Sequence, residues 1–473
     1  MALRTRPESG MPAVGAAGNA RYHAKARERV RVNLGGTAEV RLLSHGQGLF
    51  FDGRKSEAKE ILMRAKPVRQ LIDCVQRVAE CSPFYQKIFE EHGVAAEDVK
   101  TMADFEALPF SEKDDLRRVY PLGLQAVPDE RVVRIHSSSG TTGDPVIIPY
   151  TAKDVADWAT MFARCYQMMG MTARDRIQIT PGYGLWTAGI GFQAGAEKFG
   201  AMVVPMGPGN TEKQLKMMVD LQTTVLASTS SYALLLGEEI GRRGLRDKIA
   251  LKKGIIGSER WGDKMRSRIK ADLGIEIYDV YGLTEVYGPG IAIDCDHHVG
   301  LHYWDDFIYM EIIDPETLKP VPDGEYGEVV ITTMHKEGAP LLRYRTHDIS
   351  RLIPGPCPCG SPFPRHDRIL GRTDDMFKVK AVNMYPRQVE DLLRTVPGVS
   401  SEYQVRITNE AGHDTVYLRF EVEDGASLSA AEAAVAGKFR AMIGISVKPQ
   451  AGYIGSLPRS TKKTARVIDE RNE

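Results

Sequence analysis

The chain has 473 residues, in which 62 Lys and Arg residues balance 62 Asp and Glu residues, and 42% of the residues are hydrophobic. This length is too great for one ordinary hydrophobic core and predicts two or three domains. The balanced charge provides no general attraction to nucleic acid or to an anionic membrane, so small-molecule partners are expected.

No stretch approaches the roughly 20 apolar residues that a bilayer span needs, and the N-terminus lacks the apolar core of a signal peptide. We therefore expect a cytoplasmic protein. Residues 1–55 begin with a basic run that Glu8 and Glu28 interrupt. They are interpreted as a solvated, partly disordered leader, with a targeting segment as the alternative.

The pattern after the leader alternates between strands and helices. Apolar residues recur at helical spacing between 58 and 93, which predicts packed helices. Strand-like runs follow at 132–135, 146–148, 202–204, 224–227, 254–256 and 276–280, and helical stretches lie between them at 155–169, 188–198 and 231–241. This rhythm predicts one large α/β domain with a largely parallel sheet.

The pattern changes towards the C-terminus. Runs at 307–313 and 327–332, separated by Pro-Asp and Asp-Gly turn signals, predict antiparallel strands. Past Gly371 we expect strands at 376–379, 402–408 and 414–423 and helices at 386–396 and 429–442. These form a compact α+β unit of their own, so a domain boundary is predicted near 372–374.

A run of small residues between two predicted strands is the first chemical motif: Ser137, Ser138, Ser139, Gly140, Thr141, Thr142 and Gly143. Such residues let backbone N–H groups and hydroxyls approach phosphate oxygens closely, which predicts a phosphate-binding loop. No Gly-Lys-Ser/Thr follows, so this is not a Walker A loop. Taken alone, a surface turn is the alternative.

Four further motifs follow in order, at 257–259, 279–286, 344–348 and 371–375. With them the sequence resembles the AMP-forming adenylating enzymes, and specifically the phenylacetate-CoA ligase family, from about Ser56 onward. The strongest match is the run from Tyr281 to Gly290, supported by 183–185 and 457–460. The resemblance implies an α/β fold with a large N-terminal adenylate-forming domain of mixed β-sheets and helices (56–371) and a small, mobile α+β lid (372–473).

The resemblance also implies the roles of the ATP-binding residues. The loop from Ser137 to Gly143 would hold the triphosphate, and Thr284 and Glu285 would place Mg²⁺ on the phosphates. The remaining assignments are Gly257, Ser258 and Glu259 lining the adenine site, Tyr281 stacking on the base with Gly282 beside it, Asp348 accepting a ribose hydroxyl, Arg372 contacting ATP and Asp374 acting as the hinge.

Attack of a carboxylate on an anionic α-phosphate needs charge neutralisation and alignment more than covalent help. The register of Pro458 to Ser460 and of Arg466 to Asp469 places Lys463 at the family's adenylation lysine, with Lys462 beside it. A solvated basic tail is the alternative.

Two positions depart from the family. Asp144 stands where the phosphate loop usually has lysine, and this anion would repel phosphates unless it faces solvent. His347 stands where glycine is usual, so its side chain either narrows the ribose site or requires a different backbone angle. Neither change removes an essential group.

The segment containing Tyr183, Gly184 and Trp186 resembles the family's pocket for the acid. Aromatic side chains beside glycines suit a flat ring, so an aryl acid is expected. Ordinary core packing is the alternative for Trp186.

The six cysteines are too few for a disulfide scaffold, and reduced thiols are expected. Thiolates and imidazoles suit tetrahedral Zn²⁺, and some relatives resembling this chain have a structural zinc in this region. We expect Cys295, His302, Cys357 and Cys359 as its ligands, with His298 as a substitute for His302 and free buried thiols as the alternative. A catalytic zinc is not expected, because Mg²⁺ already supplies the Lewis acid.

The sequence therefore predicts a ligase that uses ATP, Mg²⁺ and coenzyme A to activate a small aromatic acid of the phenylacetate or benzoate type. The alternatives are an adenylating enzyme that makes acyl-AMP or adenylylates a deazaflavin without CoA, and a non-catalytic nucleotide-binding homologue. A homodimer is common among relatives, but no interface is evident, so the oligomeric state stays open.

Overall fold

The computed structural model describes residues 55–138, 145–259, 261–375, 377–379, 382–410, 413–459 and 466–471. The chain divides into two units, Met1–Pro67 and Val68–Glu473. Of the first unit, only the beginning of helix α1 (Lys55–Cys81) is described. The predicted leader, up to residue 54, therefore lies outside the described residues.

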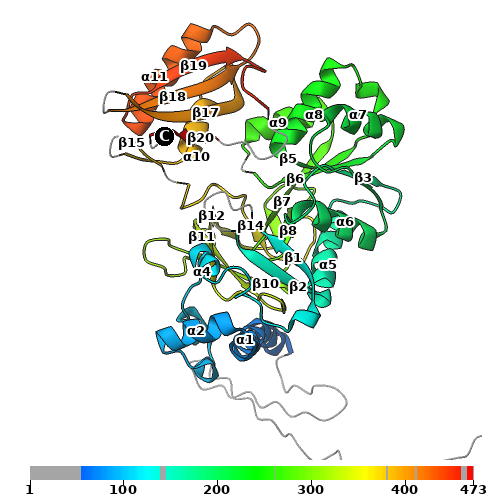
Figure 1. Ribbon diagram of the computed structural model, residues 1–473, viewed down its shortest axis with the longest axis vertical. Coiled ribbons are helices and arrows are strands. Elements are labelled where there is room, and N and C mark those ends of the chain that lie inside the picture. Colours follow the sequence, from blue (N-terminus) through cyan, green and yellow to red (C-terminus); the bar gives the residue numbers. More distant parts are fainter. Residues whose placement is uncertain are drawn as a thin grey trace, which may run out of the picture. The chain divides into compact units, whose positions relative to one another are not determined.

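In the described part of the chain, the largest sheet has nine strands in the order β13-β14-β9-β8-β7-β6-β5-β3-β4 (Figure 1). They are β3 (Arg176–Ile179), β4 (Met202–Pro205), β5 (Val225–Thr229), β6 (Lys253–Gly257), β7 (Glu276–Leu283), β8 (Gly288–Asp294), β9 (Leu301–Tyr303), β13 (Leu352–Ile353) and β14 (Arg365–His366). Neighbours from β4 to β7 are parallel, and those from β7 to β13 are antiparallel. The predicted parallel pairing stops at β7 because a short turn, not a helical crossover, connects it to β8.

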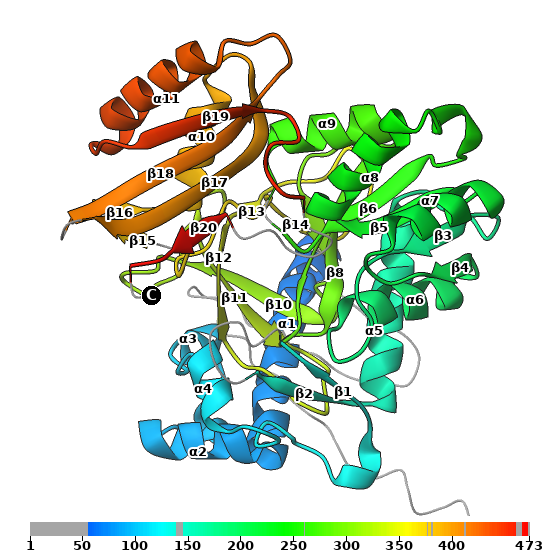
Figure 2. The same cartoon turned by 45° about the horizontal axis from the view of Figure 1, so that its top comes forward.

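Helices cover both faces of this sheet. Because side chains alternate along each strand, successive residues of one strand enter different hydrophobic cores. Val225 and Ala227 of β5 join the core beneath α5 (Ala152–Met168) and α6 (Ala188–Phe199). Leu226, between them, points to the opposite core, which contains residues of α7 (Thr211–Asp220), α8 (Ser230–Arg242) and α9 (Asp263–Leu273) (Figure 2). The doubly covered sheet is the scaffold for the loops at its strand ends.

The two strands around the predicted phosphate loop do not join the large sheet. β1 (Val132–Ser137) and β2 (Ile147–Thr151) pair with each other in antiparallel fashion. The alternation of strands and helices predicts that both belong to the parallel sheet, but no helix separates them, so they close as a hairpin. The predicted antiparallel strands β10 (Ile308–Ile313) and β11 (Gly327–Thr333) are found and extend to β12 (Tyr344–Ser350).

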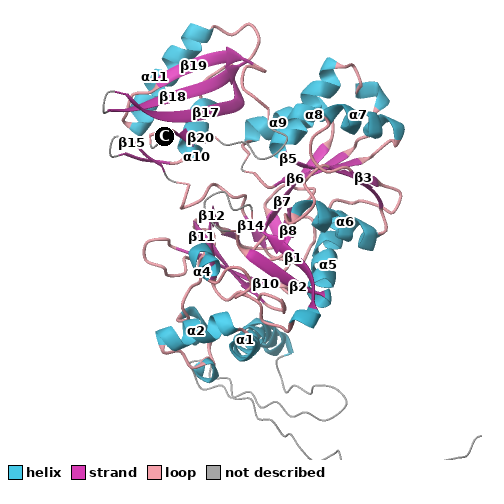
Figure 3. Cartoon of the chain, in the orientation of Figure 1, coloured by secondary structure: helices cyan, strands magenta, loops and turns pink. Residues whose placement is uncertain are grey.

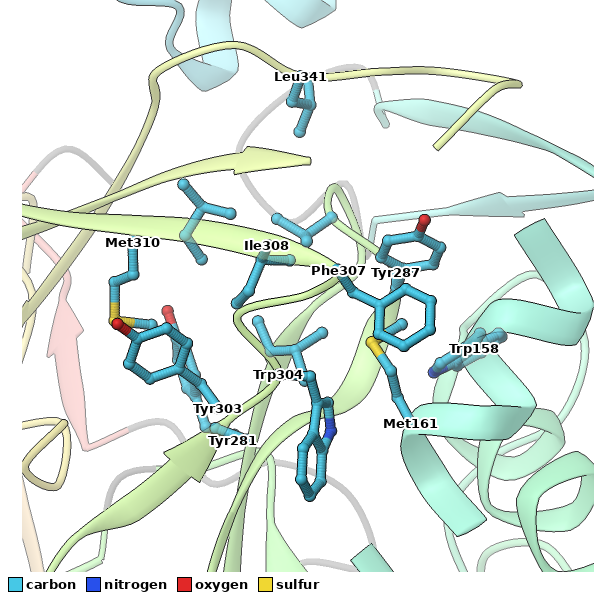
Figure 4. Close-up of a cluster of buried hydrophobic side chains, with 14 of the residues drawn as sticks. Trp158, Met161, Tyr281, Tyr287, Tyr303, Trp304, Phe307, Ile308, Met310 and Leu341 are labelled. Carbon is cyan, nitrogen blue, oxygen red and sulfur yellow. The ribbon is translucent and has the colours of Figure 1, made fainter. Parts of the chain in front are cut away.

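An aromatic core joins these layers (Figure 4). Trp158 and Met161 of α5 lie near Phe307 and Tyr287, and Ile308 and Met310 of β10 extend the same cluster. Short helices precede it in the chain: α2 (Pro83–His92), α3 (Met102–Glu106) and α4 (Lys113–Arg118). None of the described helices combines the length and the hydropathy that crossing a lipid bilayer requires.

The C-terminal part has a hydrophobic core of its own, which begins at Phe377. Its strands and helices are β15 (Phe377–Val379), β16 (Val382–Met384), α10 (Pro386–Arg394), β17 (Val399–Glu410), β18 (His413–Val422), α11 (Leu428–Ile443), β19 (Lys448–Tyr453) and β20 (Val467–Asp469). Strands β19, β18, β17 and β20 form one sheet, against which both helices pack (Figure 3). The predicted α+β unit is present; its boundary near 372–374 stays a prediction.

Candidate active site

The candidate site lies where the parallel strands β5, β6 and β7 end, the edge at which open α/β sheets bind ligands. Gly257 ends β6, and a Cβ there would lie 2.3 Å from the carbonyl oxygen of Val280, so only glycine fits. The carboxylate of Glu259 accepts hydrogen bonds from Ser230 Oγ at 2.9 Å and Ser231 N at 2.8 Å. Glu259 thus anchors its loop to the positive N-terminus of α8.

Tyr281 and Asp348 meet beside this loop. The Tyr281 hydroxyl donates to Asp348 Oδ2 at 2.7 Å, and Arg372 Nη1 donates to Asp348 Oδ1 at 3.2 Å. Arg372 also pairs with both carboxylate oxygens of Asp374 at 2.7 Å. The structure therefore brings together the four residues predicted for the base, the ribose, an ATP contact and the hinge.

Thr284 and Glu285 lie in the turn between β7 and β8. Both are buried, and Thr284 Oγ1 lies 3.2 Å from Thr187 Oγ1. Glu285 Oε1 lies 3.1 Å from the Lys113 ammonium at the start of α4. The turn therefore presents a buried carboxylate whose charge is balanced by a lysine from another part of the chain.

Only the first part of the predicted phosphate loop is described. Ser137 N donates to Leu185 O at 2.8 Å, and Ser138 Oγ accepts from Val146 N at 3.0 Å. Ser139, Gly140, Thr141, Thr142 and Gly143, together with Asp144, lie outside the described residues. The bond to Leu185 ties the loop to the predicted acid pocket.

The predicted pocket residues lie between β3 and α6. Tyr183 is half-buried and lies against Gly189, where a Cβ would come within 2.8 Å of its ring. Its hydroxyl is buried without a partner among the described residues, and burial raises the pKa of Tyr183 to about 12. Gly184 has a φ of 101° and is exposed, and Trp186 packs against the core.

His347 takes a backbone angle that non-glycine residues rarely adopt, with a φ of 63°. Its Nδ1 lies 3.0 Å from Thr373 Oγ1 and 3.6 Å from Glu328. The hydrogen bond and charge of buried Glu328 raise the pKa of His347, although burial opposes the shift. His347 thus stands in the left-handed conformation that glycine adopts readily, and its side chain contacts Thr373, in the segment before Asp374.

Cys295, His302, Cys357 and Cys359 converge, with their ligand atoms all within 4.8 Å of one another. The Cys295 and Cys357 sulfurs are 3.7 Å apart, and tetrahedral zinc spaces its thiolates about 3.8 Å apart. His302 Nδ1 lies 2.8 Å from Phe363 O, which leaves Nε2 for the cysteines. His298 is not part of this cluster. Its ring nitrogens instead contact Asp294 at 2.6 Å and Glu276 at 2.9 Å.

Lys463 and Lys462 lie outside the described residues, but both flanks of their segment are anchored. Before it, Arg459 pairs with the fully buried Glu421 at 2.8 Å. After it, Arg466 pairs with Glu402 at 3.1 Å. The two glutamates lie on neighbouring strands, β18 and β17.

Comparison with known proteins decides the family. The chain matches the AMP-binding enzyme family over residues 53–335 and the AMP-binding enzyme C-terminal domain over 381–471. The phenylacetate-coenzyme A ligase of Aromatoleum evansii is 39% identical over 425 residues, which cover 88% of this chain and 96% of that protein. The chain belongs to the phenylacetate-coenzyme A ligase family. This confirms the resemblance that the motifs indicated.

A second family member, from Escherichia coli K12, is 38% identical over 420 residues and covers 87% of this chain and 95% of its own. Among solved structures, 2-hydroxyisobutyryl-CoA ligase in its postadenylation state, bound to an acyl-AMP, has a TM-score of 0.77 at 27% identity and covers 86% of this chain and 89% of its own. These matches confirm the predicted fold class for this member of the family.

Two lysines of the site are not predicted from the sequence. Lys113 contacts Glu285, and Lys336 contacts the backbone of the same turn. Both are distant from Glu285 in the sequence, and neither stands in a motif. A lone lysine provides no spacing signal, so only the fold could reveal them.

Proposed function

We propose that this protein is an AMP-forming ligase that activates a small aromatic carboxylic acid as an acyl-adenylate and transfers the acyl group to coenzyme A. The observation that supports this most is the meeting of Tyr281, Asp348 and Arg372 beside the turn with Thr284 and Glu285. Relatives at 37–39% identity are named phenylacetate-coenzyme A ligases. A solved relative holds an acyl-AMP together with CoA.

In this proposal, Tyr281 stacks on adenine, with Gly282 beside it and Gly257, Ser258 and Glu259 lining the site. Asp348 accepts a hydrogen bond from the ribose, and Arg372 contacts the nucleotide. The loop from Ser137 to Gly143 holds the phosphates. Glu285, with Thr284, would hold Mg²⁺, which prefers carboxylate oxygens and phosphates as ligands. When bound, the ion would neutralise charge on the phosphates.

Lys463 is proposed as the cation that stabilises the transition state of adenylation. Its domain, 372–473, would turn about Asp374 between the adenylation and thioester steps, relative to the domain at 56–371. Arg459 and Arg466 support this role, because each is held by a buried glutamate at one flank of the lysine segment.

The acid is proposed to lie beside Tyr183, Gly184 and Trp186, with its ring against the aromatic side chains. Cys295, His302, Cys357 and Cys359 are proposed to bind a structural zinc, because their spacing and the orientation of His302 suit a closed tetrahedral site. A homodimer and a cytoplasmic location stay predictions, to be tested by light scattering and by cell fractionation.

The test is a panel of phenylacetate-like, benzoate-like and aliphatic acids, scored for AMP release and thioester formation with and without CoA. We expect aryl acids to give both products, with thioester only when CoA is present. AMP release without thioester would favour an enzyme that stops at acyl-AMP. No AMP with any acid, despite measurable MgATP binding, would contradict catalysis.

The role of Lys463 has a separate test. Lys463→Ala should lose ATP–pyrophosphate exchange but still convert synthetic acyl-AMP and CoA into thioester. Full exchange by this variant would exclude Lys463 from adenylation.

A further inference from the structure

Lys336 is a fully buried lysine with an unusual set of contacts. Its side chain has 0% exposure, and its ammonium donates to the carbonyl oxygens of Glu285, at 3.2 Å, and Val286. The same nitrogen lies 4.6 Å from the ring centre of Tyr150 and 5.1 Å from that of Tyr287. No carboxylate forms an ion pair with it among the residues the structure describes. Two carbonyls and two aromatic faces therefore surround the charge.

Tyr150 contacts the same turn. Its hydroxyl donates to Tyr287 O at 2.9 Å, with Thr284 O at 3.4 Å as a weaker second acceptor. Lys336 and Tyr150 thus contact the carbonyls of four consecutive residues, from Thr284 to Tyr287. The side chains of Thr284 and Glu285 make their own contacts elsewhere, with Thr187 and Lys113. The backbone of the turn is fixed independently of the groups that would meet ATP.

The segment that contains Lys336 is itself fixed. Asp154 of α5 accepts hydrogen bonds from Glu337 N and Gly338 N, both at 2.8 Å. This buried carboxylate also accepts from Thr151 N at 2.9 Å, so its position is set by the start of its own helix. Asp154 therefore holds the residues after Lys336 and directs this side chain towards the turn.

Burying an ammonium is costly unless its environment replaces water. Burial lowers the pKa of Lys336 to about 7, against the charges of Asp154 and Glu285. A methionine would fill a similar volume without this cost. Cation–π contacts favour the charged form, and carbonyl oxygens accept a stronger hydrogen bond from an ammonium than from a neutral amine. The fold therefore accommodates a charge at this point, and the charge contacts the turn next to Glu285.

We propose that Lys336, together with Tyr150, is a positioning residue for the nucleotide step: its ammonium holds the Thr284–Tyr287 turn from the inside, as a bound monovalent cation would. Thr284 and Glu285 are thereby kept in place for the magnesium and phosphates of ATP. The inference rests on the proposed function for the identity of the ligand. It concerns residues outside the motifs that support that function.

Lys336→Met tests the charge while keeping most of the volume. The values of kcat and KM per folded molecule are measured by ATP–pyrophosphate exchange, separately for MgATP and for the acid. We expect kcat/KM for MgATP to fall about 10- to 100-fold, the usual effect of losing a group that orients a metal ligand. The KM for the acid should stay within about twofold, because Lys336 contacts the backbone of the turn, whereas the pocket segment meets the turn through a different pair, Thr187 and Thr284. An unchanged kcat/KM for MgATP would overturn the proposal.

Lys253→Met is the matched control. Lys253 also donates to two backbone carbonyls, those of Met169 and Gly170, and lies 6.0 Å from the ring centre of Tyr278, at the end of β6 away from the site. Its replacement should leave kcat/KM for MgATP unchanged. If Lys336→Met does not fold, Tyr150→Phe replaces it, since it keeps the ring and removes only the hydroxyl. A several-fold rise in KM for MgATP is then expected, and an unchanged KM would overturn the proposal.

Chemical rescue separates charge from packing. In Lys336→Ala, n-propylammonium should restore exchange at least fivefold, and n-propanol should not. Equal rescue by both would show that only volume matters and would overturn the inference. If the wild-type protein shows no exchange with any acid, the proposed function fails. Calorimetric titration of MgATP into the wild type and Lys336→Met then decides the inference, which predicts weaker binding by the variant.

Discussion

Tyr281 and Arg372 donate to opposite oxygens of one buried carboxylate, that of Asp348, at 2.7 Å and 3.2 Å. Burial raises the pKa of Asp348, while both donors oppose the shift. Arg372 also pairs with Asp374. Tyr281, proposed to stack on adenine, and Asp374, proposed as the hinge, are therefore linked through Asp348 and Arg372 in one hydrogen-bond network.

Tyr281→Phe should separate the two roles of this tyrosine. The ring that would stack on adenine stays, but Asp348 loses one of two donors that orient it. We expect the KM for MgATP to rise about three- to tenfold, as for the loss of one ordinary hydrogen bond, because Arg372 still donates to the carboxylate, with kcat nearly unchanged. Exchange kinetics measure both values. A change confined to the KM for the acid would contradict the assignment of this network to the nucleotide.

Glu421→Gln should weaken the anchoring of the chain segment that precedes Lys463. Glu421 accepts from Gly455 N and Leu457 N, both at 2.9 Å, and pairs with Arg459. Glutamine lacks the negative charge, and its NH2 group can face the N–H donors that the carboxylate now accepts from. We expect exchange to fall about tenfold, with thioester formation from synthetic acyl-AMP unaffected.

Glu410→Gln is the control for that experiment, because Glu410 forms an exposed pair with Lys448 near the end of β17. Such surface pairs contribute little. Equal losses in the two variants would show that Glu421 has no special connection with adenylation.

Removal of the proposed zinc should lower the stability of the fold and leave the catalytic rate nearly unchanged. Chelation under denaturing conditions is expected to release one zinc per chain, detected with a chromogenic chelator. Cys357→Ser should bind less than a tenth of that zinc and melt at a lower temperature, because a structural metal contributes its binding energy to folding. Its kcat below the melting range should stay close to that of the wild type. Wild-type protein free of zinc after purification with added zinc would refute the site.

Acid should destabilise the protein through His366. This imidazole is buried, its Nε2 lacks a partner among the described residues, and burial lowers the pKa of His366 to about 4 from 6.5. Between these pH values the unfolded state binds the proton first, so the free energy of unfolding falls as pH drops from 6.5 to 4. In His366→Phe the slope of the unfolding free energy against pH should decrease by up to about 1.4 kcal/mol per pH unit. Urea titrations at pH 6.5, 5.5 and 4.5 measure it, and identical slopes would contradict this origin.

Local patterns predicted much of this molecule. The helix around 155–169, the strand at 276–280 and the C-terminal helices were found near their expected bounds, because their apolar spacing is regular. Helix α9 was not predicted, since its buried residues Met265, Ile269 and Leu273 stand among charged neighbours. β3 was not predicted either, since the polar residues Arg176 and Gln178 alternate with its two isoleucines.

The site shows the same division. Tyr281, Thr284 and Glu285 stand in one motif, so their neighbourhood could be predicted. The convergence of Cys295 with Cys357 across 62 positions followed from the resemblance and not from spacing. Lys336 reaches the turn only because Asp154, far earlier in the chain, fixes its segment. Such contacts depend on tertiary packing, which no local pattern contains.

The position of Thr284 and Glu285 in a β-hairpin limits how this enzyme can be redesigned. The register of β7 and β8 pairs Leu283 with Gly288, so an inserted or deleted residue would change which side chains face the proposed triphosphate site. The pocket segment around Tyr183 belongs to a separate loop between β3 and α6. Libraries aimed at new acids can therefore vary the side chains of that loop, provided that they keep the contacts of Leu185 with Ser137 and of Thr187 with Thr284.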